Sequence, residues 1–149
     1  MLHMRGSLQS FAGALFAAAF LLMQGPARAQ DPTLAETRAI EALISSQIDA
    51  FRSDDSTRAY SFASPVLQRQ FVNPETFMSM VKGGYQPVYR PKSVAFGRLR
   101  EVKGNLVQEV FVVGPDGKDW TALYAVEQQP DGSWRISGCK LLDEPRVSA

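Results

Sequence analysis

The sequence predicts an α+β fold in which N-terminal helices pack on a curved four-stranded antiparallel meander. Apolar residues between positions 33 and 52 recur every three or four residues, as in an amphipathic helix. The later part of the chain is divided into four strand-length runs rich in Val, Phe, Tyr, Trp and Leu. Helices followed by consecutive hairpins are typical of an α+β domain, with the long first helix in the concavity of the sheet.

The first helix is expected to begin after Thr33 and to extend to about Arg52. Thr33 and Glu36 have the spacing of a capping box, in which each residue satisfies a backbone N–H group of the other. One apolar stripe follows along the helix. It consists of Ile40, Leu43, Ile44, Ile48 and Phe51.

Two further helix starts follow. Ser53-Asp54-Asp55 breaks the apolar stripe and offers an N-cap to a second, short helix, which must stop near Ser64-Pro65. Asn73-Pro74 supplies a cap followed by proline at the first helical position, so a third helix is expected over 75–82, ending at Gly83-Gly84. Residues 85–91 contain two prolines four positions apart, which favours an extended crossover.

The strands are expected at 93–102, 106–113, 119–128 and 134–142. Lys103-Gly104-Asn105 and two Pro-Asp-Gly turns connect them. In those two turns the proline presets the first corner, the aspartate bonds the turn backbone and the glycine accepts a positive φ. In the third strand, Trp120, Ala122, Tyr124 and Val126 alternate with Thr121 and Glu127, which predicts one covered face and one wetter face.

Residues 1–29 have the three zones of a cleavable signal peptide. Arg5 gives a basic start, residues 11–23 form an apolar run, and Ala27-Arg28-Ala29 ends the segment. The run is too short for a membrane-spanning helix, which needs about 20 residues. We expect cleavage between Ala29 and Gln30 and export to the periplasm by the general secretory route, with no membrane anchor after cleavage.

The mature chain is expected to be a single domain over 30–149, with its core at about 33–143. Removing Arg5 and Arg28 from the sixteen basic residues leaves fourteen against fifteen acidic residues, a net charge of −1. This balance argues against a nucleic-acid partner. The one histidine, His3, lies in the signal peptide, so a zinc or iron site is not expected and no cofactor is predicted.

Cys139 is the one cysteine, so it cannot form an intramolecular disulfide. A lone cysteine in a strand pattern is most often a small buried apolar residue. A nucleophilic role would require an activating base nearby. We therefore expect Cys139 to be packed and unreactive.

Several stretches of the chain carry a family resemblance. They are Gln47-Ile48-Asp49-Ala50-Phe51, Phe62-Ala63-Ser64-Pro65, Phe77-Met78-Ser79-Met80-Val81, 84–91 with a central Tyr-Arg-Pro, and Trp134-Arg135-Ile136-Ser137-Gly138-Cys139. Together they resemble a bacterial family called domain of unknown function 4864. The order of elements, with Asp55 at the start of the second helix, is similar to the cone-shaped fold of nuclear transport factor 2 and ketosteroid isomerase. The family has no assigned activity, so the resemblance implies a fold and a location.

Carboxylates and aromatic residues are the candidates for chemistry in such a cone. Asp49, Asp54 and Asp55 could each supply a base, although Asp54-Asp55 is also the expected composition of a helix start. Tyr85, Tyr89 and Arg90 are predicted to approach the open end of the cone and to bind a small apolar or anionic ligand.

Three functions stay open. The first is a non-catalytic periplasmic binding or accessory domain. The second is a cofactor-free lyase, isomerase or hydrolase that uses a carboxylate. The third is a protein-interaction module that forms a homodimer through the outer face of the sheet. A buried unpaired carboxylate would favour catalysis, an apolar pocket would favour binding, and a sealed core would favour interaction.

Overall fold

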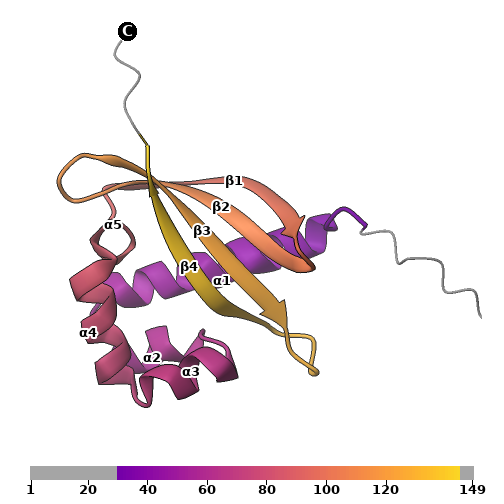
Figure 1. The fold of residues 1–149 in the computed structure, drawn as a ribbon, viewed down its shortest axis with the longest axis horizontal. Helices are drawn as coiled ribbons and strands as arrows, with labels where there is room; N and C mark the ends of the chain where they lie inside the picture. Colours follow the sequence, from indigo (N-terminus) through magenta and orange to yellow (C-terminus); the bar gives the residue numbers. More distant parts are fainter. Residues whose placement is uncertain (1–29, 145–149) are drawn as a thin grey trace, which may run out of the picture.

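The computed structural model describes residues 30–144, so the expected signal peptide at 1–29 and the cleavage-site residue Ala29 lie outside the described residues. In this part of the chain, helices precede an antiparallel sheet, which confirms the α+β class (Figure 1). The elements are α1 (Leu34–Arg52), α2 (Ser56–Ser61), α3 (Pro65–Phe71), α4 (Pro74–Gly84), α5 (Gln86–Tyr89), β1 (Ser93–Val102), β2 (Asn105–Val113), β3 (Asp119–Gln128) and β4 (Trp134–Asp143).

The sheet is a meander in the order β1-β2-β3-β4, as the three predicted turns require. Lys103 and Gly104 form a two-residue turn with φ values of 50° and 83°, the left-handed pair that matches the twist of the flanking strands. Gly117 and Gly132 have φ values of 80° and 86° at the ends of the two Pro-Asp-Gly turns. The Ser133 N–H donates to the Asp131 carboxylate at 2.9 Å, so the aspartate bonds the turn backbone as predicted.

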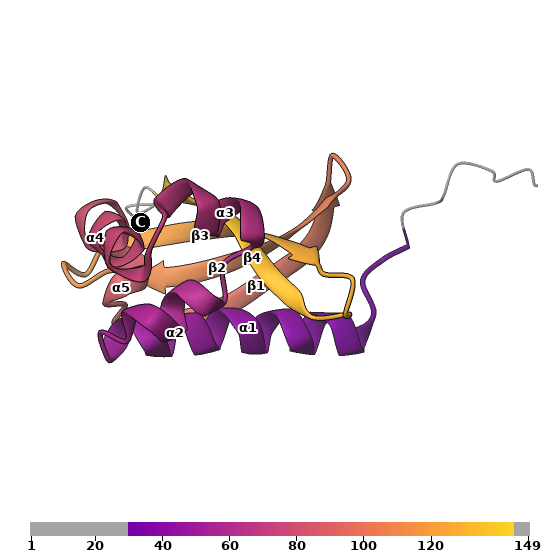
Figure 2. The ribbon, with the colours of Figure 1, turned by 90° about the horizontal axis from the view of Figure 1, so that it is seen from below.

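The helix α1 runs along one face of the sheet (Figure 2). Its capping box is present: the Glu36 N–H donates to the Thr33 hydroxyl at 3.1 Å, and the Thr33 N–H donates to the Glu36 carboxylate at 2.8 Å. The predicted stripe faces the core, where Ile40, Ile44 and Ile48 are almost completely buried. Burial of this stripe stabilises α1 more than its intrinsic propensity does.

The second helix begins where the sequence predicts, because the Asp55 carboxylate accepts a hydrogen bond from the Arg58 N–H at 3.1 Å. We expect Asp55→Ala to lower the free energy of unfolding by about 1 kcal/mol through loss of this cap. Urea denaturation at constant m-value measures the change. Asp55→Asn is the matched control, because an amide oxygen also caps; an equal loss in both variants would contradict the capping role.

One predicted boundary needs correction. The second helix ends at Ser61, and a separate helix that the sequence did not predict, α3, occupies Pro65–Phe71. Ser64 caps α3 by accepting from the Leu67 N–H at 3.3 Å, and Pro65 takes the first helical position. A serine followed by proline therefore starts a helix here, for the same reason that Asn73-Pro74 starts α4.

The extended crossover predicted at 85–91 is wrong, because this segment contains the one-turn helix α5. Pro87 lies in the first turn of α5, where its missing N–H would have had no helical partner, and Pro91 follows the end of the helix. The two prolines thus delimit a helical turn instead of a stiff strand. Side chains on the segment point in directions set by a helix, which changes where Tyr89 and Arg90 lie.

One hydrophobic cluster joins the helices to the inner face of the sheet. Phe77 of α4 lies at its centre, with ring centroids 5.8 Å from Tyr60, 5.7 Å from Phe71 and 6.3 Å from Phe51. The inner face of β3 is covered as predicted at Ala122, Tyr124 and Val126. Thr121, expected on the wetter face, is buried and bonds the Glu144 carboxylate at 2.8 Å. Among residues 30–144, no helix is long and apolar enough to cross a membrane.

Candidate functional site

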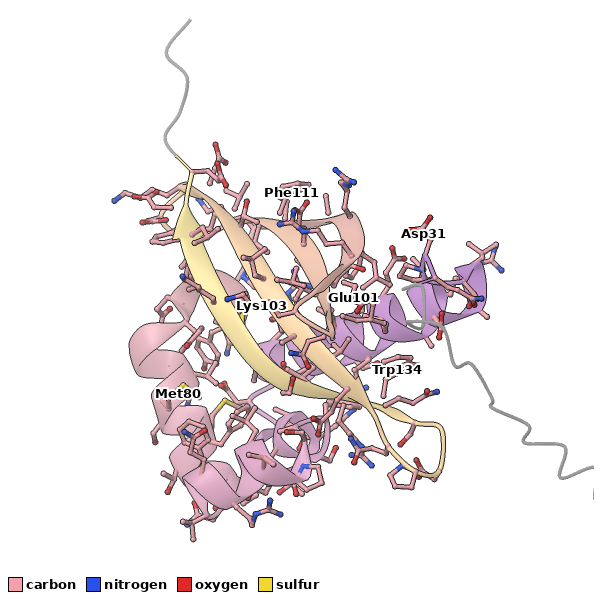
Figure 3. The ribbon with its side chains drawn as sticks, turned by 45° about the vertical axis from the view of Figure 1, so that its right-hand side comes forward. Asp31, Met80, Glu101, Lys103, Phe111 and Trp134 are labelled. Carbon is pink, nitrogen blue, oxygen red and sulfur yellow. The ribbon has the colours of Figure 1, made fainter. Side chains whose placement is uncertain are left out.

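A cavity of about 330 Å³ lies where α3 and α4 meet the edge strand β4. Its size is within the usual range of small-molecule pockets, about 300–1,000 Å³. The helices contribute mostly apolar side chains, including Phe51, Phe71, Phe77 and Met80. Met80 of α4 lies beside β4 (Figure 3). The cavity is therefore a mainly apolar pocket between a helical layer and one edge of the sheet.

A β-bulge in β4 shapes the opposite wall. Ile136 pairs with Val126 and Gly138 pairs with Ala125, so Ser137 is an extra residue with no counterpart on β3. Residues 136–139 all line the pocket. Bulges of this kind re-aim side chains and are common beside binding sites.

The loop between α2 and α3 holds the outer edge of β4 at this bulge. The Ile136 N–H donates to the Phe62 carbonyl and the Ser64 N–H donates to the Ile136 carbonyl, both at 2.8 Å. Tyr85 closes another side, because its hydroxyl donates to the Cys139 carbonyl at 3.2 Å. The edge of β4 is thus fixed against the helices at two points, with the pocket beside them.

Tyr124 is the most unusual group in the pocket wall. It is 1 % exposed, and its hydroxyl makes no hydrogen bond among the described residues. Burial raises the pKa of this hydroxyl well above its ordinary value, so it keeps its proton at neutral pH. A buried hydroxyl without a partner costs roughly 1–3 kcal/mol, so a ligand group that accepts its hydrogen bond would recover that cost.

Cys139 lies directly opposite Tyr124 on the neighbouring strand. The two side chains therefore share a face of the sheet, about 5 Å apart at their β-carbons. Burial raises the pKa of the Cys139 thiol to about 12, and interaction with the Tyr124 hydroxyl opposes part of this rise. The thiol is the polar group that faces the Tyr124 hydroxyl on this side of the sheet, and sulfur accepts a hydrogen bond only weakly, so the hydroxyl stays poorly satisfied.

We expect Cys139 to react slowly with a bulky disulfide reagent in the native state, even at pH 9, because the reactive thiolate is scarce well below a pKa of about 12. Thiol titration with absorbance detection measures the rate. The same protein unfolded in denaturant is the control and should be labelled completely. Rapid, complete labelling of the native protein would show that the half-buried thiol is accessible and would restore a nucleophilic role.

The three residues predicted to bind a ligand lie in two places. Tyr85 lines the pocket, but Tyr89 and Arg90 do not. The Tyr89 hydroxyl and Arg90 guanidinium both donate to the Asp54 carboxylate, with Arg90 Nη2 2.9 Å from Asp54 Oδ2. Arg90 also donates to the Phe51 carbonyl and stacks 4.0 Å from the centroid of the Tyr89 ring. We call Asp54, Tyr89 and Arg90 the clasp.

The clasp fastens the end of α1 to α5 at the protein surface. The hydrogen bond from Tyr89, followed by the positive charges of Arg90 and Lys82, lowers the pKa of Asp54, and Lys82 lies 3.8 Å away. The same hydrogen bond raises the pKa of Tyr89. Asp54 adopts a φ of 53°, a left-handed conformation that aspartate tolerates better than most residues. These contacts indicate that the clasp stabilises the fold by connecting the end of α1 to α5.

The candidate carboxylates all lie outside the pocket wall. Asp49 is exposed and lies 3.8 Å from Arg52 in an ion pair. Asp54 belongs to the clasp, where its lowered pKa makes it a weak base. Asp55 caps α2. Among residues 30–144, no group of three or more His, Cys, Asp or Glu side chains could hold a metal ion.

Tyr124 is not among the residues that the sequence predicts to bind a ligand. Its pairing with Cys139 depends on the bulge, since continuous pairing from the Pro-Asp-Gly turn would place Gly138 opposite Tyr124. A signal does exist: Tyr124 alternates with Ala122 and Val126 on the covered face of the third strand. That pattern predicts burial but not the absence of a partner for the hydroxyl.

Comparison with curated proteins finds no match. The model of one protein family, described as a domain of unknown function, DUF4864, matches residues 33–149. The matched region includes every helix, every strand and every pocket residue described above. Because the match covers most of the chain, the protein belongs to the DUF4864 family, as its motifs predict.

Proposed function

We propose that this protein binds a small molecule, without chemical conversion, in the pocket between α3, α4 and β4. The observation that carries the proposal is the buried Tyr124 hydroxyl in the wall of a mainly apolar cavity, which has no hydrogen-bond partner within residues 30–144. A folded domain of ordinary stability tolerates such a cost where the group has a role. Hydrogen bonding to a bound molecule is the role that the position of Tyr124 favours.

Binding fits this wall better than catalysis does. The described residues that line the pocket include no carboxylate, imidazole, ammonium or guanidinium group. Burial raises the pKa of the Cys139 thiol to about 12, so the thiol is protonated at neutral pH and is a poor nucleophile. The wall therefore offers apolar contact and hydrogen bonds, the composition of a binding site.

A thermal-shift screen of small apolar and polar compounds tests the proposal. We expect a subset of compounds to raise the melting temperature of the wild-type protein, because a ligand that binds the native state stabilises it. Met80→Trp should fill the pocket and abolish these shifts. Ser79→Trp is the matched control, since Ser79 is exposed on the same helix and does not line the pocket. Shifts that persist in Met80→Trp, or no shift with any compound, would overturn the proposal.

We also propose that the protein works in the periplasm after removal of residues 1–29. The acid-free start, the short apolar run and the Ala27-Arg28-Ala29 ending support this location. Intact-mass analysis of periplasmic extract should detect a chain that begins at Gln30. Recovery of the full-length chain in the membrane fraction would contradict the proposal.

A second candidate function is self-association through the outer face of the sheet. Phe111 is 48 % exposed on this face, and its ring lies so close to Gly97 that a β-carbon there would be 2.7 Å from it. Four residues away on the same face, Val107 lines a mainly apolar hollow of about 370 Å³ with Leu123 and Ala125. A knob and a hollow on one face suit a two-fold dimer, in which each copy inserts Phe111 into the other.

Sedimentation velocity tests this second candidate. We expect the wild-type protein to sediment as a dimer and Phe111→Asp to sediment as a monomer with an unchanged circular dichroism spectrum. Val66→Asp is the matched control, because Val66 is also exposed but lies on α3. A monomeric wild-type protein at high concentration would exclude this function.

A further inference from the structure

We infer that the molecule bound in the pocket is uncharged and has an apolar body with one hydrogen-bond acceptor, such as a carbonyl oxygen, directed at Tyr124. This inference rests on the proposed binding function and defines the class of its ligand. It depends on three features of the wall: which donors are already used, where the charges lie, and which side chains surround the remaining space.

The donors of the wall are not equivalent. The Tyr85 hydroxyl already donates to the Cys139 carbonyl at 3.2 Å, and Gln47 Nε2 donates to the Ala59 carbonyl at 3.2 Å. Tyr124 is the pocket residue whose buried polar atom lacks a partner among the described residues. Its hydroxyl stays protonated because burial raises its pKa, so it can donate to a ligand. The complementary ligand group is an acceptor.

The charges of the protein argue for an uncharged ligand. Arg90, the cation that the sequence suggested for ligand binding, lies outside the pocket wall and is bonded to the Phe51 carbonyl and the Asp54 carboxylate. An ionised carboxylate transferred into this pocket would lose its hydration without meeting an opposite charge. An ammonium ion would lose its hydration in the same way. Neutral ligands avoid this cost. An anionic ligand, which the sequence suggested on the basis of Arg90, is therefore not expected in this pocket.

The remaining wall suits a flat apolar body. Phe51, Phe71 and Phe77 contribute rings at different tilts, which favour both edge and face contacts with an aromatic ligand. Met80 adds a flexible thioether that adapts to the shape of a ligand. A bicyclic aromatic molecule with one carbonyl group therefore matches the pocket in size and chemistry.

Three ligands of nearly the same shape test the inference by isothermal titration calorimetry. They are 2-acetylnaphthalene, which has a neutral acceptor, 2-ethylnaphthalene, which has none, and 2-naphthoate, which is an anion. We expect the ketone to bind about 3- to 10-fold more tightly than the ethyl compound, the effect of one neutral hydrogen bond. We expect the anion to bind at least about 100-fold more weakly than the ketone, because its desolvation is not compensated.

The variant Tyr124→Phe removes the donor and should bring the ratio of ketone to ethyl affinity to about one. The ratio is measured within one protein, so a change in overall stability does not affect it. Tyr60→Phe is the matched control, because the Tyr60 hydroxyl donates to the Gln68 carbonyl at 2.7 Å and Tyr60 does not line the pocket. It should keep the wild-type ratio.

The outcomes separate this inference from the proposed function. Binding of all three ligands with equal affinity, tighter binding of 2-naphthoate, or a ratio that persists in Tyr124→Phe would overturn the inference and leave pocket binding intact. Binding of none of the three, together with an empty thermal-shift screen, would overturn both. Binding of the ketone and the ethyl compound with the expected ratio supports both.

Discussion

Replacing Phe77 by alanine is expected to lower the free energy of unfolding by about 3–5 kcal/mol, the usual cost of removing a buried phenylalanine. Phe77 is 3 % exposed and contacts three aromatic rings from three other segments of the chain. Its truncation would leave a cavity that these rings cannot fill without leaving their own packed positions. The loss is large compared with the whole stability of a small domain, about 5–15 kcal/mol.

Urea denaturation monitored by tryptophan fluorescence measures this loss. An unchanged m-value would show that unfolding remains two-state. Val66→Ala is the control, because an apolar side chain is removed from an exposed position on α3, and it should change stability by less than about 0.5 kcal/mol. Similar losses in the two variants would show that Phe77 is not at the centre of the core. Because Phe77 also lines the pocket, ligand binding should weaken in Phe77→Ala.

The second large effect is expected for Arg90→Ala, which opens the clasp. The buried Phe51 residue would lose the charged donor to its carbonyl, and a hydrogen bond to a charged group contributes about 1.5–3 kcal/mol. The stacking on Tyr89 and the ion pair with Asp54 would be lost as well. We expect a lower melting temperature but unchanged binding of 2-acetylnaphthalene by the folded protein, since Arg90 lies outside the pocket.

Arg90→Lys distinguishes the hydrogen bonds and ring stacking of the arginine from the effect of its positive charge alone. A lysine keeps the positive charge but lacks the planar group that reaches a carbonyl, a carboxylate and a ring together, so it should recover only part of the lost stability. Thermal melts of the wild type and both variants give the comparison. Full recovery by lysine would show that charge alone matters. Loss of ligand binding in folded Arg90→Ala would instead place Arg90 in the binding site.

Much of the fold was predictable because its signals are local. The capping box at Thr33 and Glu36 involves residues three positions apart, and the stripe of α1 repeats within one or two turns. Each hairpin glycine occupies a position whose backbone has a positive φ, so the requirement involves that residue alone. Each signal acts through a few neighbours, so it persists in whatever tertiary structure surrounds it.

The predictions for residues 65–71 and 85–91 failed because one local pattern is compatible with two structures. Ser64-Pro65 can stop a helix before it or start one after it, and the structure uses the second meaning for α3. Pro87 and Pro91 are compatible with an extended segment or with the two ends of a helical turn. Packing against α1 and α4 selects the turn, and this moves Tyr89 and Arg90 away from Tyr85 to the clasp.

Local sequence patterns were enough to predict the α+β class, the positions of most elements, the meander order and the family. Which side chains meet in the pocket depends on how distant elements pack. One extra residue at Ser137 shifts the pairing of β4 so that Cys139 lies opposite Tyr124, and Tyr85 bonds the Cys139 carbonyl across 54 positions of sequence. No local pattern encodes these contacts, because burial and hydrogen bonding of such groups depend on how distant elements pack.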